Sequence, residues 1–345
     1  PIPAPCLDKL PPLTKGATDW ICWRGAKGDG RSEVKGIRRD WSGGLNKIWS
    51  IDFLCQGDSG GSWSAPVVVG DRVFLCGRSD TEDLLFCLNS NDGKLLWKSG
   101  YKVEAGSSHG AGPRATPFID EGRVYTFGRS GDIVCWSGFD GAKAWHRNVG
   151  KEGGKEPEWG HSSSPIIWRD LLIIHAGGTA RAIAYDKMSG KVVWKSGEGE
   201  AGYAPLVPTT IDGTSCLISF HGSGLALLDA KTGKEFWNLP WDTDYFVNAT
   251  TPVIEGNHVF ISSGYNKGCA FVKMTKAKGT VVYENKEIAS HHSDPFILDG
   301  YLYSYTGQSF QNRGSFKCIE LKSGALKWST NEMGWGTCVY VDGYL

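Results

Sequence analysis

The 345-residue chain carries 37 basic and 37 acidic residues, so its formal net charge is zero. No basic stripe marks a nucleic-acid partner, and the longest apolar stretches are strand-sized, well short of the roughly 20 residues that a membrane-spanning helix needs. Composition therefore excludes a nucleic-acid-binding protein and a helical membrane protein. It leaves a globular chain whose length alone would allow two domains.

The first nineteen residues are the only segment whose composition predicts an extended tail. They are rich in proline, begin with PIPAPC and predict an extended arm over residues 1–19, ahead of a single domain over residues 20–345. No signal peptide precedes the arm, as in a processed chain. Cys6 and Cys22 flank this junction, and a disulfide between them is an open alternative.

A short hairpin motif recurs from residue 49 onwards. In its clearest copy, LALLDAKTGKEFW, an apolar strand leads to a turn at Gly233, and a return strand ends at Trp237. Five further copies also place an aromatic residue four positions after the turn glycine, and a half-copy, NKIWSIDF, carries Trp49. By subtraction of their numbers, the aromatic residues recur every 43 to 49 residues: Trp49, Trp97, Trp145, Trp194, Trp237, Tyr283 and Trp328.

A second kind of hairpin precedes each copy of the first. It begins with a proline, continues as an apolar strand and turns at Gly, Asp or Asn into another strand, as in ATPFIDEGRVYTFG. The prolines are Pro66, Pro117, Pro165, Pro208, Pro252 and Pro295. Each unit therefore contains four antiparallel strands over about 45 residues, which predicts a β-propeller blade. A β-sandwich, the alternative, would not repeat its turns at a fixed period.

The repeated aromatic residues are predicted to pack between blades. A large side chain on the outermost strand can cover the seam to the neighbouring sheet. We therefore expect one group of tryptophans to be largely buried: Trp97, Trp145, Trp194, Trp237 and Trp328.

The last unit is divided between the two ends of the sequence. Residues 45–53, with Trp49, should supply its outer strand and residues 337–341 its inner strand, and no segment supplies the middle. The prediction is an all-β, seven-bladed propeller whose last blade is shared by the N- and C-terminal strands and is incomplete. Either the natural chain continues past Leu345, or another segment fills the gap, with the arm before Trp20 as the expected donor.

The pattern from Ala226 to Trp237 resembles the tryptophan-docking repeat of the pyrroloquinoline-quinone (PQQ) type propellers. The segment DWICWRGAKGDGRS is similar to the start of exported, BamB-like members of that group. This resemblance implies a periplasmic or cell-envelope protein. Because the group contains both quinoprotein dehydrogenases and non-enzymatic scaffolds, fold alone leaves the activity open.

Two other motifs have structural explanations. Cys87, Cys135 and Cys318 occupy the same position in three repeats, where other repeats have Ala184 and Leu227, so they are expected to be small buried side chains. The GDSGG motif of residues 57–61 imitates a serine-protease nucleophile loop. The repeat explains it as the connection between two blades, and the first histidine, His109, follows it instead of preceding it.

The candidate site lies at one end of the central channel. Loops that precede each innermost strand should rim the channel, together with the loops between the second and third strands. The candidate ligand or partner residues are Trp63, Arg78, Arg114, Arg129, His161, Tyr203, His221, Asn248, His291, His292, Gln308 and Trp335. The mixture of aromatic, imidazole, amide and guanidinium groups suits a flat ligand, an anion or a protein surface.

Metal binding is not indicated by any spacing signature. His161 could join His291 or His292 across the channel, and Asp242 and Asp244 offer oxygen atoms of the kind that Ca²⁺ prefers. No metal site is predicted from these residues.

Two functions are compatible with the sequence. The first is a non-catalytic, monomeric, exported propeller without a cofactor, which binds a protein, peptide or glycan at its rim. The second is a PQQ- and Ca²⁺-dependent alcohol or sugar dehydrogenase. The resemblance implies that such dehydrogenases carry adjacent cysteines and long enclosing loops. This chain has no Cys-Cys pair and only short loops, so we expect the first function.

Overall fold

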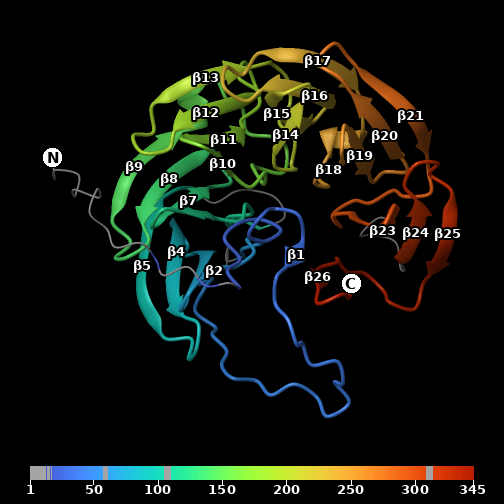
Figure 1. Cartoon of the computed structure of the whole chain (residues 1–345). Coiled ribbons are helices and arrows are strands. Elements are labelled where there is room, and N and C mark those ends of the chain that lie inside the picture. Colours follow the sequence, from blue (N-terminus) through green and yellow to red (C-terminus); the bar gives the residue numbers. More distant parts are fainter. Residues whose placement is uncertain (1–12, 14–15, 17, 57–60, 105–109, 308–313) are drawn as a thin grey trace.

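The computed structural model describes residues 13, 16, 18–56, 61–104, 110–307 and 314–345. Figure 1 shows its sheets arranged around a centre, in chain order. Six sheets have four antiparallel strands each, in the order of the sequence, and a seventh is a two-stranded parallel pair. We number the four-stranded sheets as blades 1 to 6, and we call the strands of each blade A to D from the centre outward.

The blades have the following strands. Blade 1 contains β2 (Val67–Val69), β3 (Arg72–Arg78), β4 (Glu82–Asn89) and β5 (Leu95–Lys102). Blade 2 contains β6 (Phe118–Asp120), β7 (Arg123–Phe127), β8 (Asp132–Ser137) and β9 (Lys143–Asn148). Blade 3 contains β10 (Ile166–Trp168), β11 (Leu171–His175), β12 (Ala182–Asp186) and β13 (Val192–Ser196).

The second half of the ring follows the same plan. Blade 4 contains β14 (Val207–Ile211), β15 (Thr214–His221), β16 (Gly224–Asp229) and β17 (Glu235–Pro240). Blade 5 contains β18 (Val253–Glu255), β19 (His258–Ser263), β20 (Gly268–Met274) and β21 (Gly279–Asn285). Blade 6 contains β22 (Phe296–Leu298), β23 (Tyr301–Thr306), β24 (Ser315–Glu320) and β25 (Leu326–Thr330). Two short 3-10 turns, η2 (Val149–Glu152) and η3 (Asp244–Phe246), lie in loops.

The seventh sheet joins the two ends of the described chain. It pairs β1 (Arg31–Ser32) with β26 (Tyr340–Val341). The predicted propeller fold, with a last blade shared between the ends and incomplete, is therefore confirmed. One detail was wrong, because the N-terminal partner is Arg31–Ser32 and residues 45–53 form no strand. A strand needs a hydrogen-bonded neighbour, and among the described residues none lies along residues 45–53.

Apolar side chains fill every seam between consecutive blades. One cluster joins blades 2 and 3 through Tyr125, Trp145 and Tyr185, and comparable clusters join the other neighbours. Residues 49–54 pack in the same manner on Phe86 of blade 1 and its neighbours. Although this segment forms no strand, it covers the face of blade 1 that a seventh blade would cover.

Six of the seven repeated aromatic residues, all except Trp328, lie on the turn glycine of the next blade. A Cβ atom placed on Gly233, which has a φ of +71°, would lie 2.5 Å from Cε3 of Trp194. The indole Nε1 of Trp194 donates to the Ala230 carbonyl at 3.3 Å, and Trp145 makes the equivalent bond to Lys187 at 3.0 Å. Trp49 meets Gly93 in this way and Tyr283 meets Gly324. Glycine is required here by both the positive φ and the close approach of the ring.

Trp97 is the exception to this hydrogen-bonding rule. Its Nε1 is buried and has no hydrogen-bond partner among the residues that the structure describes. The equivalent acceptor, the Gly138 carbonyl, instead accepts a hydrogen bond from Nη1 of Arg72 at 2.7 Å. The ring of Trp97 still covers Gly141. Apolar contact at the seam therefore persists without the hydrogen bond.

The burial prediction holds for only part of the series. Trp145 and Trp194 are buried, and Trp97 and Trp237 are half-buried. The prediction was wrong for Trp328, which is 43% exposed. Trp328 follows the turn of blade 6, and no further turn glycine lies on its ring among the described residues.

We predict that Trp194→Ala and Trp328→Ala differ sharply in their effect on stability. Trp194→Ala should lower the free energy of unfolding by about 3–5 kcal/mol, because it empties a closed seam. Trp328→Ala should lower it by less than about 1 kcal/mol, because water already reaches this ring. Urea denaturation of both variants measures the difference, and equal losses would contradict the docking geometry.

A pair of glycine variants separates steric clash from backbone strain. Gly233 and Gly213 have nearly the same φ, +71° and +72°, but a Cβ on Gly213 would meet nothing within 4 Å. Gly213→Ala should therefore cost only the strain of positive φ, about 1 kcal/mol. Gly233→Ala should cost several times more, because it displaces Trp194. Thermal unfolding of the two variants tests this, with similar midpoints as the contrary outcome.

Candidate functional site

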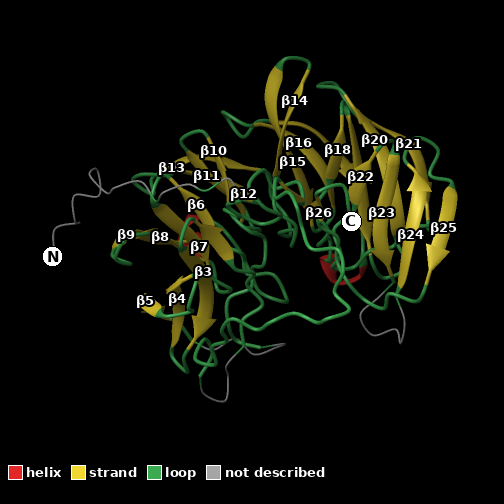
Figure 2. Cartoon of the chain, turned by 60° about the horizontal axis from the view of Figure 1, so that its bottom comes forward, coloured by secondary structure: helices red, strands yellow, loops and turns green. Residues whose placement is uncertain are grey.

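The rim loops lie where strands A begin and strands B end. In Figure 2 the blades are joined by loops at both ends, and further loops fill the centre of the ring. Strand A begins at or beside a proline in each blade, as at Pro165 before β10. Proline suits this position because it has no N–H to contribute to the ladder. Because strand A starts at the equivalent place in every blade, the loops before the A strands all lie at the same end of the channel.

The segment of residues 20–34 crosses the central channel. Trp20 exchanges two backbone hydrogen bonds with Val68 of blade 1, and Ile119 of blade 2 donates to the Ile21 carbonyl at 2.9 Å. On the other side of the ring, Nε1 of Trp23 lies 3.0 Å from Asp294, and Arg31 donates to the Ile297 carbonyl. Nε1 of Trp23 also donates to Thr251, just before blade 5, at 2.9 Å, so the segment ties blades 1 and 2 to blades 5 and 6.

A cavity of about 270 Å³ remains beside this segment. Its walls are residues 22–28 on one side and the inner strands of blades 3 and 4 on the other, including Ile166, Pro205 and Val207. Cys22 lines it as a buried free thiol, and burial raises the pKa of Cys22 to about 12. The possible partner of Cys22, Cys6, lies outside the described residues. The cavity walls are mostly apolar, and Lys27 and Thr251 are among the polar residues that line them.

Several predicted site residues lie beneath the rim surface. Arg78, Arg129, His161, His221, Asn248 and His291 are all buried. Nδ2 of Asn248 donates to the His221, Gly222 and Trp241 carbonyls, which fastens blade 4 to blade 5. Arg78 is fully buried and donates to Asp83 at 2.7 Å. These two side chains hold the rim loops in place.

Other predicted residues reach the surface. Trp63, His292 and Trp335 are exposed, and Arg114 and Tyr203 are half-buried, whereas Gln308 and the serine of the GDSGG motif lie outside the described residues. Arg114 and Arg129 both donate to the Gly110 carbonyl. Tyr203 donates its backbone N–H to the Asn248 carbonyl at 3.0 Å. The contacts therefore connect Arg114 with Arg129, and Tyr203 with Asn248, whereas no described contact brings Trp335 to either pair.

A row of aromatic rings follows the rim from blade 3 to blade 6. Ring centroids lie 6.2 Å apart for Trp159 and Tyr245, 5.6 Å for Tyr245 and Tyr265, and 4.9 Å for Tyr265 and His291. His292 extends the row at 3.8 Å from His291. We call these five residues the aromatic row. Tyr203 contacts the row, because its hydroxyl accepts a hydrogen bond from the backbone N–H of Trp159 at 3.3 Å.

Trp159 and Tyr245 were not among the predicted site residues. They lie in the two loops EPEWGH and WDTDYFVN, where aromatic residues stand among acidic ones outside any strand. That composition is unusual for a connection between blades and is the signal that could have identified them. Tyr245 is 55% exposed and Phe246 beside it is 46% exposed.

Backbone strain accompanies this row. Tyr245 and Phe246 both have a φ of 59°, and Tyr265 and Asn266 have φ values of 52° and 57°. Non-glycine residues seldom adopt this left-handed region, and they keep it only where the surrounding structure imposes it. Asn248 contributes by fixing the loop that follows η3. This backbone geometry consequently sets the direction in which the side chains of Tyr245 and Tyr265 leave the loops.

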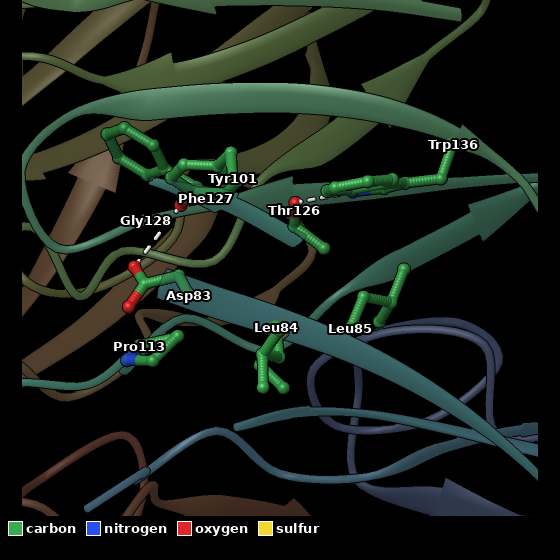
Figure 3. Close-up of a pocket in the computed structure, with 10 residues that line it drawn as sticks. Asp83, Leu84, Leu85, Tyr101, Pro113, Thr126, Phe127, Gly128 and Trp136 are labelled. Atoms are coloured by element: carbon green, nitrogen blue, oxygen red, sulfur yellow. Dashed lines mark hydrogen bonds between the residues drawn. The ribbon is translucent and has the colours of Figure 1, made fainter. Parts of the chain in front are cut away.

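A second, much smaller cavity lies between blades 1 and 2. Figure 3 shows Tyr101 donating to the Asp83 carboxylate and Nε1 of Trp136 donating to Thr126, at 3.2 and 2.9 Å. Burial raises the pKa of Asp83, although Arg78 beside it acts in the opposite direction. The cavity measures about 10 Å³, room for no more than one water molecule. It is a packing gap within a hydrogen-bonded seam.

Buried histidines make the fold sensitive to acid. Burial lowers the pKa of His161 to about 3, of His175 to about 4 and of His221 to about 3. Each binds a proton more weakly in the folded state than in the unfolded state, where the ordinary pKa is near 6.5. Their stabilising effect is complete above pH 6.5 and is lost as the pH falls toward 4.

We predict that the free energy of unfolding falls by about 2 kcal/mol per histidine between pH 7 and pH 5. His161→Phe should reduce this loss, because its ring fits against Phe127, 4.8 Å away, and cannot take a proton. Urea denaturation of both proteins at pH 7, 6 and 5 provides the measurement. Identical pH profiles would show that His161 does not contribute.

Among the described residues, no helix is long and apolar enough to cross a membrane. Likewise, no group of three or more His, Cys, Asp or Glu residues in the described ranges is placed to hold a metal ion. The loop carboxylates of Asp242 and Asp244, considered as Ca²⁺ ligands from the sequence, are both exposed. They belong to no such group.

Comparisons with known proteins agree with this architecture. The chain is 24% identical over 200 residues to the outer membrane protein assembly factor BamB of Burkholderia pseudomallei, a match that covers 57% of this chain and 46% of that protein. It therefore spans less than half the length of this relative. The crystal structure of BamB from Moraxella catarrhalis superposes with a TM-score of 0.54 at 18% identity, covering 76% of this chain and 73% of the other.

An enzyme shares the fold as well. The quinohemoprotein alcohol dehydrogenase from Comamonas testosteroni superposes with a TM-score of 0.71 at 12% identity, over 99% of this chain and 72% of that one. At such identities the likeness concerns the fold alone. A model of the PQQ-repeat family described as outer membrane protein assembly factor BamB matches residues 81–330. That range includes most of the ring, and the chain belongs to this family of β-propellers.

Proposed function

We propose that this chain is a non-catalytic, exported propeller that binds a partner protein, peptide or glycan through the rim formed by the loops before strands A. The observation that carries the proposal is the aromatic row. Two of its rings, Tyr245 and His292, are exposed, and Trp159 and Tyr265 are half-buried. Aromatic rings at a surface are typical of recognition surfaces, because they offer a large contact area at little cost in conformational entropy. Membership of the BamB family supports a binding function and an exported location.

The alternative is a PQQ-dependent dehydrogenase, and the described residues fit it poorly. A quinone paired with Ca²⁺ needs a flat slot and a set of carboxylate and carbonyl ligands. The cavity beside residues 22–28 has largely apolar walls, and the nearby carboxylate of Asp294 already accepts hydrogen bonds from Trp23 and Thr251. The aromatic row lies in the loops of the rim, and neither of the two cavities described above is lined by its residues.

A cross-linking experiment tests the proposed function. A photoreactive amino acid is placed in turn at His292 and Trp63 on the rim and at Val193 on the outer strand β13, all of which are exposed. In cells of the source organism, the same partner should be recovered from both rim positions and not from Val193. Recovery from all three positions alike, or from none, would contradict rim binding.

An activity assay tests the alternative. The purified protein is incubated with PQQ and Ca²⁺, and oxidation of alcohols and sugars is followed with a dye acceptor. We expect no dye reduction above that of a protein-free control. Quinone-dependent turnover that saturates with substrate would establish the dehydrogenase function in place of the proposed one.

A further inference from the structure

The cavity of about 270 Å³ beside residues 20–34, which we call the strap, has an apolar interior. Three prolines lie in its walls, and proline carries no N–H that could donate to a ligand. Most of the remaining surface comes from the side chains of Phe118, Ile166, Ile167, Leu206 and Val207. Such walls favour a molecule that is itself apolar, because both surfaces then leave water together.

The polar side chains of the interior are hydrogen-bonded within the protein. The Cys22 thiol donates to the Gly25 carbonyl at 2.8 Å. The Thr251 hydroxyl donates to Asp294 at 2.8 Å and accepts from Nε1 of Trp23 at 2.9 Å. Neither side chain retains a donor for a ligand, so a polar group that entered the cavity would lose hydrogen bonds to water without replacing them.

Exposure distinguishes the two ends of the cavity. Cys22, Leu206 and Thr251 are buried, so they lie at its inner end. Lys27 and Pro208 are exposed, so they lie at its mouth. Of the described residues that line the cavity, Lys27 alone carries a charge. The site therefore combines an apolar interior with one cation at its entrance.

We propose that this cavity binds a small amphiphilic carboxylate, whose apolar body enters the interior while its carboxylate pairs with the Lys27 ammonium at the mouth. A cavity of about 150 Å³ holds benzene, a ring of six carbons, so the same filling gives roughly ten carbon atoms in this larger cavity. The proposal does not depend on rim binding, because no residue of the aromatic row lines the cavity.

The ion pair between Lys27 and Glu33 can exchange for a pair with the ligand. Nζ of Lys27 lies 3.0 Å from Oε1 of Glu33, and the two side chains are 68% and 64% exposed. An ion pair in this position contributes little, because water screens both charges. A ligand carboxylate replaces one exposed pair by another while its apolar body becomes buried. Burial therefore supplies most of the affinity, and Lys27 selects for an anionic head group.

The wall that the strap contributes is held in place by the protein itself. Two consecutive turns shape it, since the Gly25 N–H donates to the Cys22 carbonyl at 3.0 Å and the Gly28 N–H to the Gly25 carbonyl at 3.3 Å. Between them Arg24 donates to the Pro295 carbonyl at 3.0 Å, which fastens the turns to blade 6. A wall fixed by such bonds keeps its shape before a ligand arrives, which lowers the entropic cost of binding.

The test is isothermal titration calorimetry of the purified chain with butanoate, hexanoate, octanoate, decanoate and dodecanoate. Affinity should rise about four-fold for each added methylene group, because each one is buried. It should stop rising near decanoate, where the cavity is full. Absence of measurable octanoate and decanoate binding would overturn the proposal. So would an affinity that is independent of chain length, or one that keeps rising through dodecanoate as it would on an open surface.

Head-group analogues and charge variants test the assignment of Lys27. Octanoate should bind about two- to five-fold more tightly than the neutral octanamide, and octylammonium should bind most weakly. Lys27→Gln should remove the difference between octanoate and octanamide, and Glu33→Gln should tighten octanoate by about two-fold, because it removes the competing carboxylate. Lys94→Gln is the matched control, since Lys94 forms an exposed pair with Asp92 at 3.0 Å outside the cavity. Tighter binding of octylammonium than of octanoate would overturn the proposal.

Filling variants locate the ligand in the cavity. Val207 is half-buried in its wall, so Val207→Trp should occupy the space and weaken octanoate binding at least ten-fold. Ala26→Trp adds the same ring at the exposed mouth, where folding tolerates it, and should also weaken binding. Val193→Trp, on the exposed face of β13, is the control and should leave the affinity unchanged. Full octanoate affinity in the cavity variants that keep the thermal midpoint of the parent protein would overturn the proposal.

Discussion

The contact between an aromatic ring of one blade and the turn glycine of the next is the interaction on which this ring depends. Single blades expose two apolar faces, so each blade is stable only when its neighbours cover it. The ring of Trp194 lies so close to Gly233 that no other residue fits, and its indole N–H satisfies a carbonyl of the same turn. Position, backbone conformation and hydrogen bonding are therefore set together at this seam.

The fold could be predicted because this contact repeats in the sequence. A glycine and an aromatic residue four positions later mark one end of every blade, and a proline marks the start of nearly every innermost strand. The seventh sheet was harder, because its pairing depends on which distant backbone lies nearby. Residues 45–53 resemble the other outer strands in sequence, yet only Trp49 and its neighbours keep their packing, while Arg31–Ser32 provides the hydrogen-bonded partner of β26.

The position of the rim loops could be predicted from the sequence more accurately than the positions of their side chains. Topology places the loops before strands A at one end of the channel, so His291, His292 and Tyr203 could be assigned to the rim from the sequence. Which rim residues are buried could not be predicted, because burial depends on how loops from different blades pack. Asn248 is an example, because it belongs to a rim loop but its side-chain amide donates to three carbonyls beneath the surface. Trp159 and Tyr245 approach each other only because loops from separate blades meet. No local sequence pattern predicts such a contact.

The strap formed by residues 20–34 has a consequence for how the molecule is made. Trp23 is separated by 271 residues from Asp294, and Arg31 by 266 residues from Ile297. During synthesis the strap leaves the ribosome before any of the six blades, whereas half of its partners are translated with blades 5 and 6. Blades 1 to 4 can therefore form while the strap still has only its early partners, Val68 and Ile119. Its final threading across the ring is a late event of high contact order, and such steps are slow.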